Sequence, residues 1–148
     1  MENLSLGGLV SEEAVKQAAR AVQADGFIMR QPNGYETEVQ ELGSNFSAGE
    51  RQLLAFARAL ALDPEVLVLD EATSNVDSVT EEKLQVALET LLKDRTAIVV
   101  AHRLSTIRES DRIIVLKHGE VEDEGTHDEL MARPGLYQKL AKLHFEAA

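Results

Sequence analysis

Apolar residues along the first part of the chain recur at the spacing of a helix. The pattern predicts one helix that starts at Ser11, where a capping residue is followed by two acids, and that runs to a stop signal at Asp25-Gly26. It predicts a second helix from Ser47 to Asp63-Pro64, with an apolar stripe along one side. Residues 31–45 carry Asn and Gly at both ends and are predicted to form a loop. The chain therefore opens with a helical part.

Beyond Pro64 the pattern changes to strands that alternate with helices. Residues 66–69 and 96–101 are short unbroken apolar runs, typical of strands buried on both faces of a parallel sheet. A helix is predicted over 78–93, with an apolar face turned inward. The remaining predicted elements are a hairpin of strands 112–116 and 120–124, a short helix capped by Thr126-x-x-Glu129, and a last helix over 135–145. This order predicts an α/β layered architecture.

Composition and charge narrow the classes of protein that fit this pattern. The chain has 148 residues, of which 44% are hydrophobic, so its length is sufficient for a folded core. Lys and Arg number 15 against 26 Asp and Glu, a net charge of −11, so we expect no nucleic-acid partner. The absence of cysteine excludes disulfides, cysteine zinc sites and thiol nucleophiles. No apolar run is long enough to span a bilayer, so we expect no direct membrane insertion of this chain.

Two adjacent carboxylates, Asp70 and Glu71, directly follow the first predicted strand. The carboxyl edge of a parallel sheet is where ligands bind in α/β proteins. One carboxylate there can hold Mg²⁺ through water, while its neighbour orients or deprotonates an attacking water. The alternative is an acidic turn after a strand, with no ligand.

A second candidate site lies at the start of the helix that begins near Ser47. Ser47-x-x-Glu50 is a capping box, which needs no ligand to explain it. The small residues Ala48 and Gly49 would also leave backbone N–H groups accessible at a helix N-terminus, where anions bind. Capping and phosphate binding are compatible, so both interpretations stay open.

Histidine and a polar turn supply the remaining candidates. His102 follows the second buried strand, level with the two carboxylates, although a single histidine is more often structural than catalytic. Residues 74–77 form a polar turn that either leads into the next helix or lies near a ligand. The other histidines, His118, His127 and His144, are interpreted as surface residues without metal-ligand spacing.

The order and spacing of these segments resemble the nucleotide-binding domain of ATP-binding-cassette (ABC) transporters, especially the exporter type. The similarity covers practically the whole chain. Its motifs are Asn45–Glu50 for the signature motif, Val66–Asp70 for the Walker B strand, Glu71 for the catalytic glutamate, Ser74–Asp77 for the D-loop, His102 for the switch histidine and Thr37–Glu41 for the loop that faces the membrane domains.

The resemblance implies a fold, a division of the chain and a set of partners. The fold is a partial P-loop NTPase (ABC ATPase) fold. Residues 1–62 would form the helical (signature) subdomain, and residues 63–148 the C-terminal part of the ATPase core. The complete domain would bind ATP and Mg²⁺, pair with a second nucleotide-binding domain and drive the transmembrane domains of an exporter. It would lie in the cytoplasm, at the cytoplasmic face of the membrane.

The resemblance also implies roles for individual residues. Asp70 would position Mg²⁺ through water, Glu71 would polarise the hydrolytic water, and His102 would contact the γ-phosphate. Glu71 and His102 are therefore the expected catalytic residues. The expected nucleotide-contacting residues are Ser47, Ala48, Gly49, Glu50, Asp70 and Asp77.

The phosphate-binding loop of the family, G-x-x-x-x-G-K-[ST], does not occur in this sequence, because none of its six lysines follows a glycine. We therefore expect the chain alone to be inactive as an ATPase. The strand before that loop would also be missing from the sheet, which predicts a chain that self-associates, pairs with the missing half or rearranges. Two alternatives are a non-hydrolysing module that donates its signature motif in trans and an inactive truncated product that self-associates.

The signature motif departs from the family consensus L-S-G-G-Q at three positions. Phe46 replaces the usual Leu, Ala48 the first Gly and Glu50 the Gln, whereas Ser47 and Gly49 are intact. Glu50 adds a negative charge near the expected phosphate. This charge would weaken the contact unless a cation such as Arg51 pairs with it.

Overall fold

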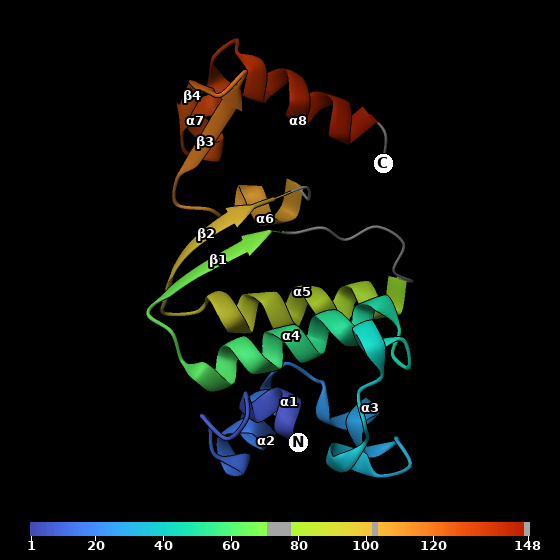
Figure 1. The fold of residues 1–148 in the computed structure, drawn as a ribbon. Helices are drawn as coiled ribbons and strands as arrows, with labels where there is room; N and C mark the ends of the chain where they lie inside the picture. Colours follow the sequence, from blue (N-terminus) through green and yellow to red (C-terminus); the bar gives the residue numbers. More distant parts are fainter. Residues whose placement is uncertain (71–77, 102–103, 147–148) are drawn as a thin grey trace. The chain divides into compact units, whose positions relative to one another are not determined.

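The computed structural model describes residues 1–70, 78–101 and 104–146. Three of the predicted site residues, Glu71, Asp77 and His102, lie outside the described residues. The helices and strands are α1 (Glu2–Ser5), α2 (Glu12–Ala21), α3 (Asp25–Met29), η1 (Gly34–Glu36), η2 (Glu41–Gly43), α4 (Ala48–Leu62), β1 (Val66–Asp70), α5 (Ser78–Leu92), β2 (Thr96–Val100), α6 (Leu104–Arg108), β3 (Ile113–Lys117), β4 (Glu120–Gly125), α7 (His127–Ala132) and α8 (Leu136–Glu146), drawn in Figure 1.

The chain divides into two compact units. The first contains the described residues of Met1–Leu69 and Thr73–Ile98, and the second those of Asp70–Ala72 and Val99–Ala148. None of the described helices is both long enough and apolar enough to cross a bilayer.

Helices α2, α4 and α5 supply most of the core of the first unit. Helix α4 packs against both α2 and α5, and it lies beside α5 in Figure 1. As predicted, one face of α5 is buried through Leu84, Ala87, Leu88 and Leu91. Leu53 of α4 belongs to the same cluster. The helical periodicity therefore identified the faces that meet in this core.

The first predicted helix ends earlier than the sequence indicated. Helix α2 stops at Ala21, and Gln23 takes a φ of +59°, in the left-handed region. Asp25 then stands in the first turn of α3, so Asp25-Gly26 begins a helix and does not end one. A carboxylate in a first turn faces the positive end of the helix dipole, which explains why Asp25 suits this position. The prediction of one continuous helix from Ser11 to Asp25 was wrong.

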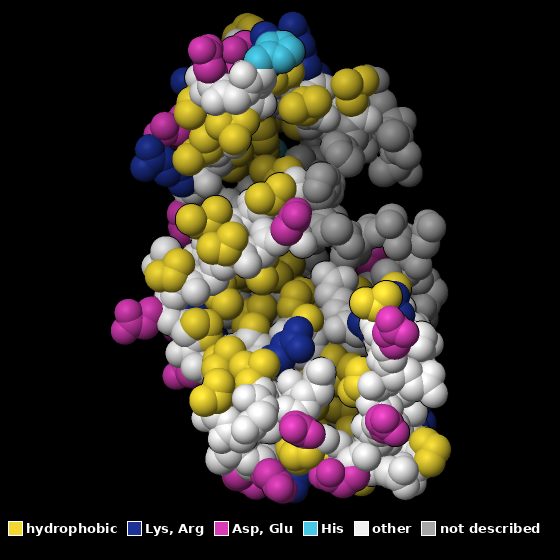
Figure 2. Space-filling view, in the orientation of Figure 1, with side chains coloured by type: hydrophobic (Ala, Val, Ile, Leu, Met, Phe, Trp, Pro, Cys, Tyr) yellow, Lys and Arg dark blue, Asp and Glu magenta, His cyan; other side chains and the backbone are white. Residues whose placement is uncertain are grey.

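Strands β1 and β2 form a two-stranded sheet with one apolar face exposed. Leu67, Leu69 and Ala97 contribute to the helical core of the first unit. The alternate side chains are exposed, namely Val66, Val68, Ile98 and Val100, and hydrophobic side chains are visible at the surface over these strands in Figure 2. The prediction that both strands are buried on both faces was therefore wrong. The apolar composition reflects a face that nothing in the described part of the chain buries fully.

The second unit contains the predicted hairpin. Strands β3 and β4 pair antiparallel, with Ile113 opposite Gly125 and Lys117 opposite Glu120. His118 and Gly119 form the turn, and both have positive φ. One face of the hairpin and helices α7 and α8 enclose a small core of Ile113, Val115, Leu130, Tyr137 and Ala141.

The start of α7 is capped as the sequence predicted. Thr126 Oγ1 accepts from Glu129 N at 3.3 Å, and the Glu129 carboxylate accepts from Thr126 N at 2.9 Å. The hydrogen bond from the Thr126 backbone holds the pKa of the Glu129 carboxyl below its usual value.

His127 is not the surface residue that the sequence suggested. Its ring is half-buried and packs edge-on against Tyr137 of α8, with centroids 5.8 Å apart. Its Nδ1 lies 2.7 Å from the Tyr137 hydroxyl. Tyr137 is only 4% exposed, and burial raises the pKa of its hydroxyl. His127 therefore supplies the hydrogen-bond partner that a buried hydroxyl requires.

Replacing His127 with phenylalanine is expected to lower the free energy of unfolding by about 1–3 kcal/mol, because it leaves the Tyr137 hydroxyl buried without this partner. Adding Tyr137→Phe to the His127→Phe variant removes the unpaired group, so the double variant should regain part of the loss. Urea denaturation followed by circular dichroism measures both. A double variant that is less stable than His127→Phe would contradict this account.

Candidate functional site

The N-terminus of α4 is closed by the predicted capping box. Ser47 Oγ accepts a hydrogen bond from Glu50 N at 3.2 Å, and the Glu50 carboxylate accepts from Ser47 N at 2.9 Å. Ser47 and Ala48 are exposed, and Gly49 is buried. The exchange satisfies two of the backbone donors that every helix start leaves open.

Two more backbone donors of this first turn remain available. The N–H groups of Ala48 and Gly49 donate no hydrogen bond to any described residue. Free N–H groups at the positive end of a helix dipole form an anion-binding geometry. The capping box and the anion site therefore coexist, as the sequence suggested they could.

Glu50 and Arg51 do not form an ion pair with each other. The Arg51 guanidinium donates to the Phe46 carbonyl at 2.6 Å, and the Glu50 carboxylate is held by the Ser47 backbone. The side chain of Arg51 runs beside Gly43, where an added Cβ would lie 2.9 Å from Arg51 Cδ. Gly43 also has a φ of +67°, so both its conformation and its surroundings require glycine. The negative charge of Glu50 is thus balanced by the helix dipole and not by Arg51.

Phe46 anchors this turn in the core of the first unit. It is buried and packs edge-on against Phe27 of α3, with ring centroids 6.2 Å apart at 69°. Phe46 stands where the family consensus has Leu. The substitution keeps an apolar anchor directly before the helix cap, because an aromatic ring fills this buried position.

The other described candidate, Asp70, ends strand β1 with an exposed side chain. Among the described residues, no group of three or more His, Asp or Glu could hold a metal ion directly. A single exposed carboxylate suits Mg²⁺ held through water, which coordinates few protein ligands and keeps several of its waters.

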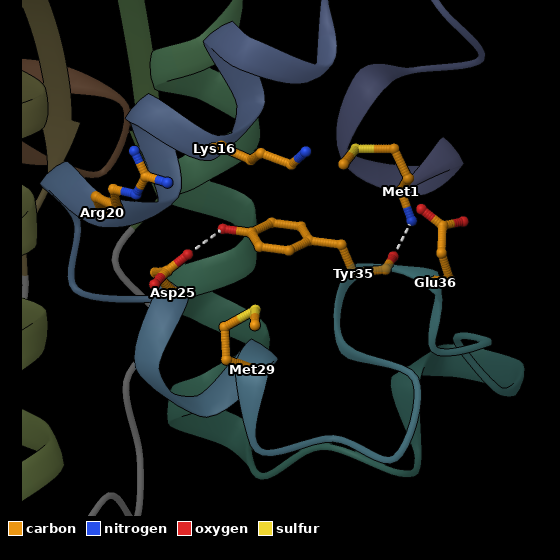
Figure 3. A pocket seen from close by; sticks show the side chains of 7 residues that line it. All are labelled: Met1, Lys16, Arg20, Asp25, Met29, Tyr35 and Glu36. Atoms are coloured by element: carbon orange, nitrogen blue, oxygen red, sulfur yellow. Dashed lines mark hydrogen bonds between the residues drawn. The ribbon is translucent and has the colours of Figure 1, made fainter.

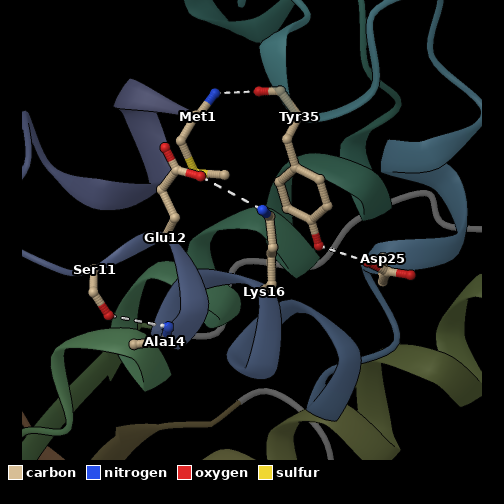
Figure 4. Close-up of polar contacts among 7 residues, drawn as sticks. All are labelled: Met1, Ser11, Glu12, Ala14, Lys16, Asp25 and Tyr35. Atoms are coloured by element: carbon tan, nitrogen blue, oxygen red, sulfur yellow. Dashed lines mark hydrogen bonds and ion pairs between the residues drawn. The ribbon is translucent and has the colours of Figure 1, made fainter.

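A cavity that the sequence did not predict lies between α1, α2, α3 and η1. Its volume is about 420 Å³, and Figure 3 shows the side chains around it. It is lined by Met1, Lys16, Arg20, Asp25, Met29, Tyr35 and Glu36. The Tyr35 hydroxyl donates to Asp25 at 2.7 Å, and the Lys16 ammonium lies 3.5 Å from Glu12 (Figure 4). Because its walls come from separate segments, no local motif marks it.

Burial raises the pKa of the Tyr35 hydroxyl, and the hydrogen bond to Asp25 and the charge of Asp25 raise it further. The folded chain therefore keeps this proton at a pH where the unfolded chain, with an ordinary tyrosine pKa of about 10, loses it. The unfolded state then binds fewer protons than the native state, so stability falls as pH rises past about 10.

Replacing Tyr35 with phenylalanine is expected to make stability less dependent on pH in this range. Tyr137 contributes in the same direction, so the decline should become shallower without disappearing. Urea midpoints measured from about pH 8 to pH 11 give the two slopes. An unchanged slope in the variant would rule out Tyr35 as a source of the alkaline decline.

Comparison with known proteins places these features in a family. A family model described as "ABC transporter" matches residues 2–74. An ABC transporter ATP-binding protein of Bacillus subtilis, YknV, is 54% identical over 149 aligned residues that cover the whole chain.

The chain belongs to the ABC transporter family.

Other ABC proteins are similar over nearly the same length. An ATP-dependent lipid A-core flippase of Syntrophus aciditrophicus is 52% identical over 92% of the chain. A solved structure of a bacterial Atm1-family ABC exporter with ATP bound matches 97% of the chain at a TM-score of 0.84 and 40% identity. The chain covers 25% of the YknV protein, 23% of the flippase and 25% of the exporter chain. It therefore spans about a quarter of the length of the relatives it matches.

The structural match identifies the fold as part of the ABC ATPase fold of exporter-type members. This confirms the fold expected from the sequence. The structure brings Ser47, Ala48, Gly49 and Glu50 together in one capped helical turn. The hydrogen bonds made by Asn45 and Arg51 around this turn were not predicted, because they join residues that no motif links.

Proposed function

We propose that this chain is part of the ATP-binding component of an ABC exporter, and that the complete domain binds and hydrolyses ATP to power transport. The observation that carries the proposal is the first turn of α4. Its free Ala48 and Gly49 N–H groups and its exposed Ser47 lie in the ABC signature motif. This is the arrangement that receives a phosphate.

Each site residue has a proposed task. Ser47, Ala48, Gly49 and Glu50 would close on the γ-phosphate of ATP bound to an opposing domain in a head-to-tail dimer, with Asp77 nearby. Glu71 would orient and polarise the attacking water, and His102 would hold the γ-phosphate. Asp70 would position Mg²⁺ through water, and the bound ion neutralises charge on the phosphates. The roles of Glu71, Asp77 and His102 rest on the family resemblance.

The proposed partners are a second nucleotide-binding domain and the transmembrane domains of an exporter, at the cytoplasmic face of the membrane. Residues 1–62 would serve as the helical subdomain and 63–148 as part of the ATPase core. The exposed apolar side chains Val66, Val68 and Ile98 support a further pairing of β1 and β2, either with the rest of the domain or with a second copy. A monodisperse monomer in light scattering would contradict self-association of the isolated chain.

The decisive experiment restores a phosphate-binding loop. The part of the YknV ATP-binding domain that precedes the matched residues is fused to this chain, and Mg-ATP hydrolysis is measured. We expect hydrolysis by the fusion and none by the chain alone. Glu71→Gln should abolish it, whereas Glu82→Gln, the same change on the exposed side of α5, should not. Activity of the fusion that survives Glu71→Gln would contradict the proposal.

A second candidate function is a non-hydrolysing module that donates its signature motif to a partner. It is favoured by the cap of α4, which is complete within this chain. The test adds the chain to an intact YknV ATP-binding domain and follows its ATPase rate. A module should change the rate, and Ser47→Arg should remove the change. An unchanged rate would leave the inactive product as the description of the chain alone.

A further inference from the structure

Asn45, two residues before the cap of α4, holds the preceding loop with both ends of its side-chain amide. Its Oδ1 accepts a hydrogen bond from Gln40 N at 3.1 Å, and its Nδ2 donates to the Glu38 carbonyl at 3.1 Å. Only this orientation of the amide satisfies both contacts. Both partners are backbone groups, so Asn45 fixes the path of the loop independently of the side chains at 38 and 40.

The outward side of the same loop is apolar and exposed. Leu42 is 92% exposed and Val39 is also exposed. Leu42 adopts a φ of +55°, which is uncommon for a residue other than glycine. A large apolar side chain held in such a conformation at the tip of a loop is typical of a contact surface. The loop is thus held on one side by Asn45 and presented to a partner on the other.

From Asn45 the backbone is held without a gap to the first turn of α4. Phe46 N donates to the Gly43 carbonyl at 2.9 Å, and the Phe46 ring is buried. Arg51, one turn into the helix, holds the Phe46 carbonyl at 2.6 Å. Ser47 and its capping box follow directly. A displacement of the loop backbone therefore has few free torsions to absorb it before it reaches the cap.

We propose that Asn45 is a positioning residue that transmits the position of residues 37–41 to the N–H groups of Ala48 and Gly49. The proposal rests on the function proposed above for those N–H groups and adds the route by which a partner that touches the loop would control them. Contact on Leu42 or Val39 shifts the loop backbone, and the shift reaches the capped turn through the two hydrogen bonds of Asn45. Asn45 itself touches no nucleotide.

Two substitutions separate the two hydrogen bonds. Asn45→Asp keeps an acceptor for Gln40 N and loses the donor to the Glu38 carbonyl. Gln40→Pro removes the N–H donor, and the φ of Gln40 is −67°, which proline adopts. Ser44→Ala is the matched control, because the Ser44 hydroxyl contacts the Gln40 side chain at 3.4 Å and its loss leaves the backbone contacts intact.

The first measurement uses the chain itself. Amide exchange of Ser47 and Glu50, whose hydrogen bonds close the cap, should become about two- to tenfold faster in both variants, the range expected for the loss of one hydrogen bond. The amide resonances of Ala48 and Gly49 should shift, while circular dichroism and the control stay unchanged. If both variants keep the exchange rates and resonances of the parent, the proposal is overturned.

The second measurement uses the fusion with the YknV segment. Both variants should lower kcat about two- to tenfold with KM for ATP nearly unchanged, because the phosphate-binding loop is intact. If the parent fusion hydrolyses ATP and the variants match it, Asn45 has no positioning role and the proposed function stands. If the parent fusion is inactive, the proposed function fails, and the amide measurements alone decide the role of Asn45.

Discussion

Replacing Leu53 with alanine is expected to lower the free energy of unfolding of the first unit by about 2–5 kcal/mol. Leu53 is 2% exposed and lies in the cluster shared by α2, α4 and α5. The cost has two parts, the lost burial of the leucine side chain and the cavity left between helices that relax only in part. Such a loss is a large fraction of the stability of an ordinary domain.

The matched control is Leu62→Ala, at the exposed C-terminal end of the same helix. It should change stability by less than about 1 kcal/mol, since little apolar surface is buried there. Chemical denaturation followed by circular dichroism gives both values. Equal losses for Leu53→Ala and Leu62→Ala would mean that α4 does not form the centre of this core.

Leu130→Ala should have a comparable effect, about 2–5 kcal/mol, on the second unit. Leu130 is 1% exposed and packs with Val115 and Tyr137 in a core of few residues. A small core has little surrounding structure that can collapse into a cavity, which favours the upper part of this range. The exposed Leu116 of β3 provides the control, and Leu116→Ala should be close to neutral.

Hydrogen exchange resolves where each core substitution acts. Leu130→Ala should accelerate the exchange of amides in the hairpin and α7, and leave the amides of α4 protected as in the parent chain. Leu53→Ala should do the reverse. A loss of protection spread equally over both units would contradict their description as separate compact units.

Features that depend on neighbouring residues were predictable from the sequence. The caps of α4 and α7 follow from Ser47-x-x-Glu50 and Thr126-x-x-Glu129, because a capping box joins residues three positions apart. The hairpin followed from two apolar strands around the turn at His118 and Gly119.

Features that depend on distant residues were not predictable. The cavity around Tyr35, the contact of His127 with Tyr137 and the support of the signature turn by Asn45 all join segments whose separation in sequence carries no pattern. His127 looked like a surface residue because a polar residue at a helix start needs no other explanation. Its packing depends on where α8 returns.

The apolar strand at Val66–Leu69 shows a different limit. Its composition indicates two buried faces, and the structure buries one. Composition records the environment of a residue in the complete assembly, whereas the described residues supply the partner for one face only. The discrepancy is therefore itself informative about the surface that pairing would cover.

The contact between Gly43 and Arg51 has a consequence for the history of the family. Because a side chain at 43 would collide with the stem of Arg51, the two positions cannot vary independently. Among related sequences, a residue larger than glycine at position 43 should appear only where position 51 is shorter than arginine, and it should then be asparagine or aspartate, which tolerate a positive φ. An aligned set in which alanine or a larger residue at 43 occurs freely beside arginine at 51 would show that this turn is built differently elsewhere in the family.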